Sequence, residues 1–79
     1  MSDYIQINPS DNVAVALRAL PKGFSATIGD NTVTLAEDIP AGHKFALRDF
    51  AEGDKVIKHG FPIAHTTQPV VNGQCLNEH

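Results

Sequence analysis

A short phrase with glycine at its centre occurs four times along the chain. In each copy an apolar residue is followed three positions later by Gly, and three positions after that by a second apolar residue. The copies are Leu20–Gly23–Ala26, Ile39–Gly42–Phe45, Phe50–Gly53–Val56 and Val70–Gly73–Leu76. Glycine reaches positive φ without a Cβ clash, which suits a tight corner where one strand stops and another begins. The phrase therefore predicts short strands joined by sharp corners.

The segments between the corners also have the residue patterns of strands. Residues 25–28 and 32–35 are rich in β-branched side chains and flank the turn sequence at 29–31, which predicts a hairpin. Residues 11–20 fit both helical spacing and strand alternation, and we favour a strand because their surroundings are β-like. Pro62 confines its segment to a sheet edge or to the start of a strand. The predicted fold class is all-β, either a small barrel or a clip of hairpins.

The composition is that of one small domain. The chain has 79 residues, 42% of them hydrophobic, and a net charge of −3 without a basic run, which argues against nucleic-acid binding through phosphate neutralisation. No stretch approaches the roughly 18–20 apolar residues of a membrane span, and the N-terminus lacks the pattern of a signal peptide. The single Cys75 fits a reducing compartment. We therefore expect a cytoplasmic domain that binds neither nucleic acid nor membranes.

The second copy of the glycine phrase carries the residues best suited to chemistry. His43 and Lys44 follow directly after the corner glycine Gly42. A His titrates near neutral pH and suits acid–base work, and a Lys pairs with a carboxylate. Neighbours on a strand point to opposite faces, so both side chains serve one site only if the turn is distorted. The chain has no HExxH or CxxC pattern, which argues against a complete metal site within it and leaves open a partial site completed by another domain.

Three blocks of the sequence resemble the N-terminal SAF domain of the altronate and galactarate dehydratases, and they occur in the same order as in that domain. They are residues 11–17, 39–47 and 56–63. The resemblance spans nearly the whole chain and implies a β-clip fold. It also implies a hydro-lyase that acts on hexonic or hexaric acids, forms a 2-keto-3-deoxy acid and uses a divalent metal such as iron or manganese. Most of such an enzyme is a much larger C-terminal domain, so we expect residues 1–79 to form a SAF-like domain that is inactive alone, carries no cofactor alone, and helps to form or cover the active site.

Two other interpretations stay open. The small subunit of sulfolactate sulfo-lyase is related to this family and is a separate short chain. A β-clip module that only binds a carbohydrate or a partner would have the same fold without catalysis. The chain ends at His79 without a Gly or Pro stop, which suggests a boundary inside a longer polypeptide, although a natural small subunit could end in the same way.

The resemblance also assigns roles to polar residues of the matching blocks. His43 is expected to be an acid–base group or a metal ligand. The family commonly has two His flanking one residue near the end of this segment; Asn77 replaces the first here, and His79 matches the second and is the expected metal ligand. The residues expected to bind the substrate are Lys44, Lys58, Asp11 and Asn12.

Overall fold

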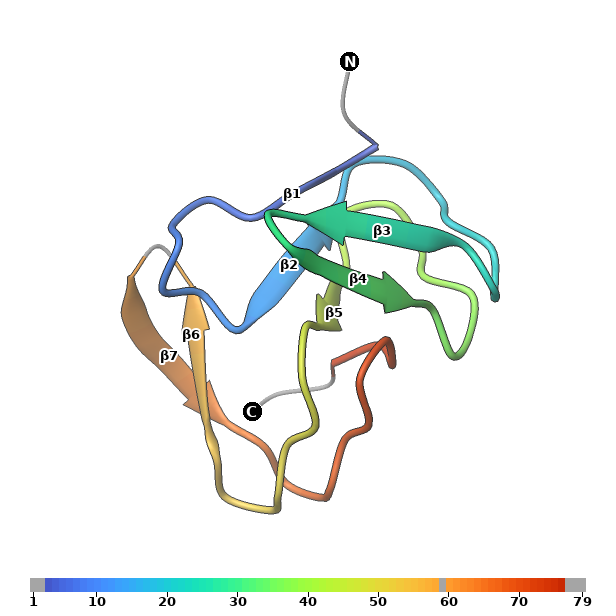
Figure 1. Ribbon diagram of the computed structural model, residues 1–79. Coiled ribbons are helices and arrows are strands. Elements are labelled where there is room, and N and C mark those ends of the chain that lie inside the picture. The colour runs from blue at the N-terminus through green and yellow to red at the C-terminus, as the bar shows by residue number, and fades with distance from the viewer. Residues whose placement is uncertain (1–2, 59, 77–79) are drawn as a thin grey trace.

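The computed structural model describes residues 3–58 and 60–76, and this part of the chain folds into strands and turns with no helix (Figure 1). The predicted all-β class is confirmed. None of the described residues therefore belongs to a helix long and apolar enough to cross a membrane. The strands are β1 (Tyr4–Ile5), β2 (Val13–Ala16), β3 (Ser25–Ile28), β4 (Asn31–Thr34), β5 (Lys44–Ala46), β6 (Lys55–Lys58) and β7 (Phe61–His65).

A small central sheet is covered by a hairpin on each face. Strands β1, β2 and β5 form this antiparallel sheet, while β3–β4 and β6–β7 are separate hairpins on either side of it (Figure 1). Alternate residues of a strand point to opposite faces. Accordingly, Ala14 and Phe45 pack with the β3–β4 hairpin in one buried cluster, while Val13 and Ala46 pack with β6 and Phe50 in a second cluster.

The four glycine phrases all form corners, as the sequence predicts. Their glycines have φ between +82° and +87°. In each corner the residue after the glycine donates a backbone hydrogen bond to the carbonyl three positions earlier, as His43 does to Pro40 over 3.1 Å. This is the geometry of a type II turn, which needs positive φ at its third position. The first apolar residues of the phrases pair across the fold as isolated bridges, Leu20 with Ile39 and Phe50 with Val70.

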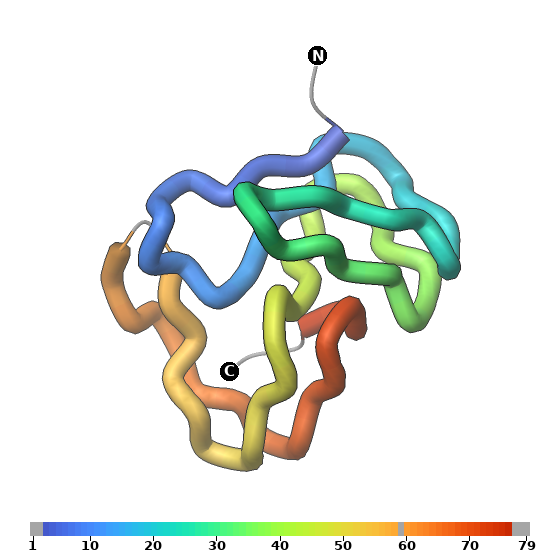
Figure 2. The backbone as a smooth tube through the Cα atoms, viewed as in Figure 1, coloured from blue at the N-terminus to red at the C-terminus, as the bar shows by residue number. Residues whose placement is uncertain are grey.

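These bridges show that the domain consists of two halves with the same order of elements. Each half of the domain runs from a central strand through a corner and a hairpin to a second corner (Figure 2). The tripeptide Ala-Leu-Arg at residues 16–18 recurs 30 positions later at residues 46–48, and Gly23 recurs as Gly53. The two halves therefore supply equivalent hairpins, which explains why each face of the central sheet is covered by one of them.

Local predictions differ from the structure mainly at element ends. The ambiguous segment 11–20 contains strand β2, so the preference for a strand is confirmed. The first hairpin turns at Gly29 and Asp30 alone, because Asn31 already pairs with Ile28 in the ladder. Pro62 lies on β7, whose partner is β6, and the register of this pair shifts between Val56 and Ile57. The edge position predicted for Pro62 is therefore correct.

Candidate functional site

His43 and Lys44 lie at the start of β5 and diverge to opposite sides of the central sheet. The exposed ring of His43 places Nδ1 4.0 Å from Sγ of Cys75. Cys75 pairs directly with Phe45, so the side chains of Cys75 and Phe45 share the face that packs on the first hairpin. Lys44 is half-buried and pairs with Val15, which places it on the other face. The divergence expected for neighbours on a strand is therefore observed, and a single ligand can reach both residues only around the end of the sheet.

Asp11 is buried and holds the tip of the second hairpin. The residue is only 5% exposed. Oδ1 accepts a hydrogen bond from the backbone N–H of Gly60 over 2.8 Å, and Oδ2 accepts one from Asn8 over 3.1 Å. Lys58 is half-buried on the same hairpin tip, where it pairs with Phe61. The carboxylate of Asp11 therefore joins the N-terminal segment to the end of β6–β7.

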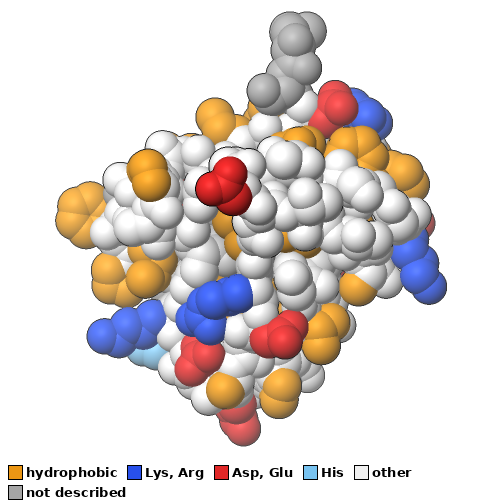
Figure 3. All heavy atoms as spheres, in the orientation of Figure 1, with side chains coloured by type: hydrophobic (Ala, Val, Ile, Leu, Met, Phe, Trp, Pro, Cys, Tyr) orange, Lys and Arg blue, Asp and Glu red, His pale blue; other side chains and the backbone are white. Residues whose placement is uncertain are grey.

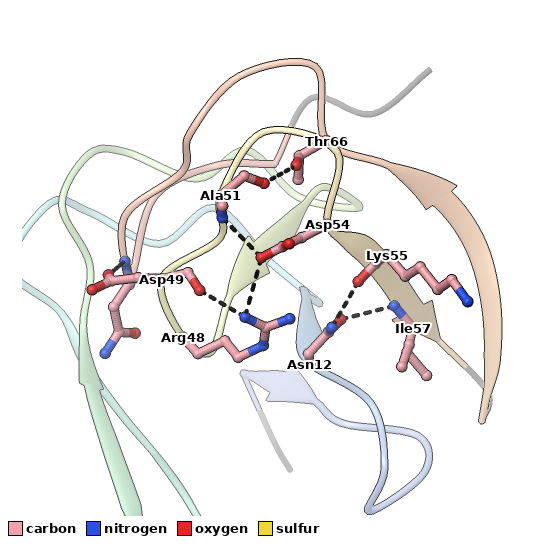
Figure 4. A network of polar contacts seen from close by, with 9 residues as sticks. Asn12, Arg48, Asp49, Ala51, Asp54, Lys55, Ile57 and Thr66 are labelled. Carbon is pink, nitrogen blue, oxygen red and sulfur yellow. Dashed lines mark hydrogen bonds and ion pairs between the residues drawn. The ribbon is translucent and has the colours of Figure 1, made fainter.

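Asn12 makes a second connection to the same hairpin through its side-chain amide (Figure 4). Its Nδ2 donates to the carbonyl of Lys55 over 2.9 Å, and its Oδ1 accepts from the N–H of Ile57 over 2.8 Å. The side-chain amide thus makes the two hydrogen bonds to β6 that the backbone of a neighbouring strand would otherwise make. The contacts that the structure shows for Asp11 and Asn12 are internal, and their predicted contact with substrate stays a prediction.

The predicted site residues therefore form two groups rather than one. Lys44 pairs with Val15 near the end of β2, whereas Asn12 immediately precedes the start of β2. Three residue steps along a strand correspond to about 10 Å. His43 and Lys44 thus lie at one end of the strand pair, and Asp11, Asn12 and Lys58 lie at the other. His79, the predicted metal ligand, lies outside the described residues, as does His59.

Arg48 is a candidate that the sequence reasoning missed. Its guanidinium lies 4.4 Å from the centroid of the Phe50 ring, and Nη1 donates to the carbonyl of Asp49 over 2.8 Å (Figure 4). Asp54 Oδ2 lies 3.6 Å from the same nitrogen. Such contacts restrict the side chain, and a restricted Arg is well suited to bind a carboxylate. The repeated Ala-Leu-Arg tripeptide was the signal that could have drawn attention to it.

Arg48 lines an open hollow together with Asp11 and Asn12, whereas Lys58 does not line it. The hollow has a volume of about 430 Å³. The polar residues on its wall are Gln6, Asp11, Asn12, Asn31 and Arg48. On the face seen in Figure 3, basic side chains are interspersed with acidic ones. The hollow therefore combines one cation, the Arg48 guanidinium, with the Asp11 carboxylate and several amides, so Arg48 is the group on its wall that can attract an anion.

Comparison with known proteins decides the family. A model of the altronate/galactarate dehydratase SAF domain matches residues 2–79. The chain belongs to this family. It is 45% identical over 76 residues to the altronate dehydratase of Escherichia coli (strain K12), an alignment that covers 96% of this chain and 15% of that protein. It is 32% identical over 76 residues to the galactarate dehydratase (L-threo-forming) of the same organism, which covers 95% of this chain and 14% of that protein.

A third relative of the SAF domain is a subunit of a different lyase. The chain is 42% identical over 41 residues to the (2R)-sulfolactate sulfo-lyase subunit alpha of Chromohalobacter salexigens. This alignment covers 52% of the chain and 44% of that subunit. The domain thus spans about one seventh of the dehydratases it matches, and it is also similar to a protein that is itself a short subunit.

The described part of the SAF domain does not itself supply a metal site. Among residues 3–58 and 60–76, no group of three His, Cys, Asp or Glu side chains is arranged to hold a metal ion. His43 and Cys75 are near each other, and Glu37 Oε2 accepts a hydrogen bond from the backbone N–H of Cys75 over 2.9 Å. A catalytic metal site such as that of zinc usually has three protein ligands. His43, Cys75 and Glu37 therefore do not form such a site on their own.

Replacing Asn12 by alanine should destabilise the SAF domain by about 1–3 kcal/mol, because two hydrogen bonds of about 0.5–1.5 kcal/mol each are lost and two backbone groups of β6 lose their partner. The free energy of unfolding, measured in urea, checks this. Asn72→Ala is the matched control: Asn72 is exposed and its side chain makes no hydrogen bond with the described residues, so its effect should stay within about 0.5 kcal/mol. Equal effects of the two substitutions would show that the Asn12 amide does not hold the hairpin.

Proposed function

We propose that this SAF domain is part of a larger hydro-lyase that removes water from a sugar acid of the altronate or galactarate type. The product is a 2-keto-3-deoxy acid. The observation that carries the proposal is the family match over residues 2–79 together with 45% identity to an altronate dehydratase across nearly the whole chain. Because the domain spans only 15% of that relative, most of the catalytic groups are expected outside it, and the domain is not expected to act alone.

The chemistry of this reaction explains what His43 and Lys44 could contribute. Dehydration begins with removal of the proton α to the carboxylate, which is a weak acid, and the negative charge that develops must be stabilised. His43 is exposed at the end of the central sheet and can exchange a proton with a substrate held there. Lys44, on the neighbouring strand position, can pair with the carboxylate. We therefore assign the acid–base role to His43 and carboxylate binding to Lys44.

The remaining predicted roles depend on the rest of the protein. The iron or manganese ion stays a proposal for the whole enzyme, with ligands drawn at least in part from outside the described residues, and it would stabilise the negative charge of the intermediate when bound. Lys58, Asp11 and Asn12 belong to the opposite end of β2, where Arg48 also lies. A second carboxylate, as in a hexaric acid, is the substrate group that this end of the domain could bind. The working compartment is proposed to be the cytosol.

A second candidate function is that of a small lyase subunit acting on sulfolactate. The observation that favours it is the 42% identity to the alpha subunit of a sulfo-lyase. The 41 aligned residues make up 44% of that subunit. That alignment covers about half of this chain, whereas the alignment to altronate dehydratase covers 96%. The longer match is the reason for preferring the sugar-acid dehydratase.

The full-length protein separates the two candidates when it is incubated with altronate, galactarate and sulfolactate, each with and without added iron or manganese. We expect altronate or galactarate to lose one water, detected by mass spectrometry, and sulfolactate to stay intact. Release of sulfite from sulfolactate, with both sugar acids unchanged, would instead identify a sulfo-lyase subunit.

A further inference from the structure

One half of the central sheet presents apolar side chains to solvent. Ile5, Val15 and Lys44 are direct partners across β1, β2 and β5, so their side chains share one face. Leu17 follows two positions after Val15, and its N–H continues the ladder by donating to the carbonyl of Asp3. Ile5 is 43% exposed and Leu17 is 53% exposed. We call Ile5, Val15 and Leu17 the apolar shelf; Lys44 lies beside it.

The shelf is the uncovered continuation of a face that is otherwise buried. Further along the same face, Val13 and Ala46 are fully buried beneath β6 and the C-terminal segment. The internal repeat sharpens the contrast. Leu47, the counterpart of Leu17 in the second half, is buried at 8% exposure and packs in the first core cluster. The position equivalent to Leu17 is thus covered in one half of the domain and open in the other.

The polypeptide leaves the described part of the domain beside this shelf. Leu76 is the last described residue, and its N–H donates to the carbonyl of Lys44 over 3.0 Å. Cys75, just before it, pairs with Phe45 on the outer side of β5. In a protein as long as the dehydratase relatives, of which this domain spans 14–15%, any polypeptide that follows Leu76 starts at the end of β5 that carries Lys44.

We propose that the apolar shelf docks against the large domain of the same polypeptide. The inference rests on the proposed function insofar as that function requires such a domain. The border of the shelf fits an interface, since an interface usually has an apolar centre and a polar rim. At that border Arg18 Nε lies 2.8 Å from Asp3 Oδ1, and this hydrogen bond lowers the pKa of Asp3, so the pair is charged at neutral pH. Docking here places Lys44 at the interface.

A second exposed apolar pair, Phe61 and Ile63 on β7, provides the comparison. Phe61 is 70% exposed, more than any residue of the shelf, and Ile63 is 47% exposed, between Ile5 and Leu17. They lie on the second hairpin, whose tip is held by Asp11 at the opposite end of β2 from Lys44. Leu76, the last described residue, instead hydrogen-bonds to Lys44 at the other end. Exposure alone therefore does not select the shelf; its continuity with Lys44 and Leu76 does.

The test compares the accessibility of two introduced thiols in the full-length protein. Leu17→Cys and Phe61→Cys are made separately, and the rate of maleimide labelling at each position is read from peptide masses, so that other cysteines do not interfere. Each rate is divided by the rate in denaturant. We expect the thiol at position 17 to react at least 10-fold more slowly than the thiol at position 61. Similar rates at both positions, or slower labelling at position 61, would overturn the proposal.

Two further outcomes decide between occupants and separate this proposal from the proposed function. If protection at position 17 disappears on dilution, the occupant is a second copy of the chain and docking on the large domain is wrong. If protection persists on dilution, the large domain covers the shelf, whether or not the protein dehydrates a sugar acid. A protected position 17 in a protein without dehydratase activity would thus support the docking surface and contradict the proposed function.

Discussion

Replacing Gly73 by alanine should cost the domain about 3 kcal/mol or more of its free energy of unfolding. Gly73 has φ +85°, where an L-residue costs roughly 1–2 kcal/mol. An added Cβ would also lie well inside van der Waals contact with the backbone carbonyl of Thr34, and relieving such overpacking typically costs a further 1–3 kcal/mol or so. A domain of this size has a total stability on the order of 4–12 kcal/mol. Urea unfolding followed by circular dichroism measures the loss.

Gly53→Ala is the matched control for this prediction. Gly53 has nearly the same backbone conformation, with φ +86°, but an added Cβ would meet no atom within 4 Å. Its loss should therefore be only the conformational cost of roughly 1–2 kcal/mol. The difference arises because the N–H of Gly73 donates to Ala46 and its carbonyl accepts from Ala36, which fixes this corner against the end of the first hairpin. Equal losses for the two glycines would contradict the account of this contact.

The second large effect is expected on catalysis. In the full-length protein, His43→Ala should lower kcat for dehydration by about 100-fold or more if the imidazole performs acid–base chemistry. The melting temperature should hardly change, because the side chain is exposed.

His65→Ala gives the matched control for His43→Ala. His65 is also exposed, and it lies on β7 opposite Lys55. The structure gives it no contact with His43 or Lys44, so its removal should change kcat by less than about two-fold. Near-normal turnover of His43→Ala, or an equal loss in both variants, would remove His43 from the proposed mechanism.

The sequence predicted the fold class and its corners because these depend on local backbone chemistry. Positive φ at the four phrase glycines follows from the absence of a Cβ, and the strand pairs follow from β-branched residues beside turn sequences. The pairing of Leu20 with Ile39 and of Phe50 with Val70 could not be predicted in the same way. Those bridges form between segments about 20 residues apart, where many alternative pairings have the same local pattern.

The candidate site was only partly predictable for a related reason. The sequence singled out His43 and Lys44, and strand geometry correctly predicted that they would diverge. It gave no sign that Asp11 and Asn12 hold the second hairpin, because their partners, Gly60 and Ile57, lie more than 40 residues away in the chain. Arg48 was missed because the repeated Ala-Leu-Arg tripeptide marks the residue but does not show that the fold places it in the same hollow as Asn12.

We propose that the domain serves a dehydration that begins at the carbon α to a carboxylate. In that reaction a base removes the proton from C2, and the C3 hydroxyl is protonated and leaves as water. The enol so formed takes up a solvent proton at C3 as it becomes the 2-keto acid. The most direct measurement is the product made by the full-length protein from altronate or galactarate in D₂O. A control sample of unlabelled product, held in D₂O for the same time, corrects for uncatalysed exchange. We expect the product to have lost one water and to carry one solvent deuterium at C3. Unchanged sugar acids, or a product without that deuterium, would contradict this proposal.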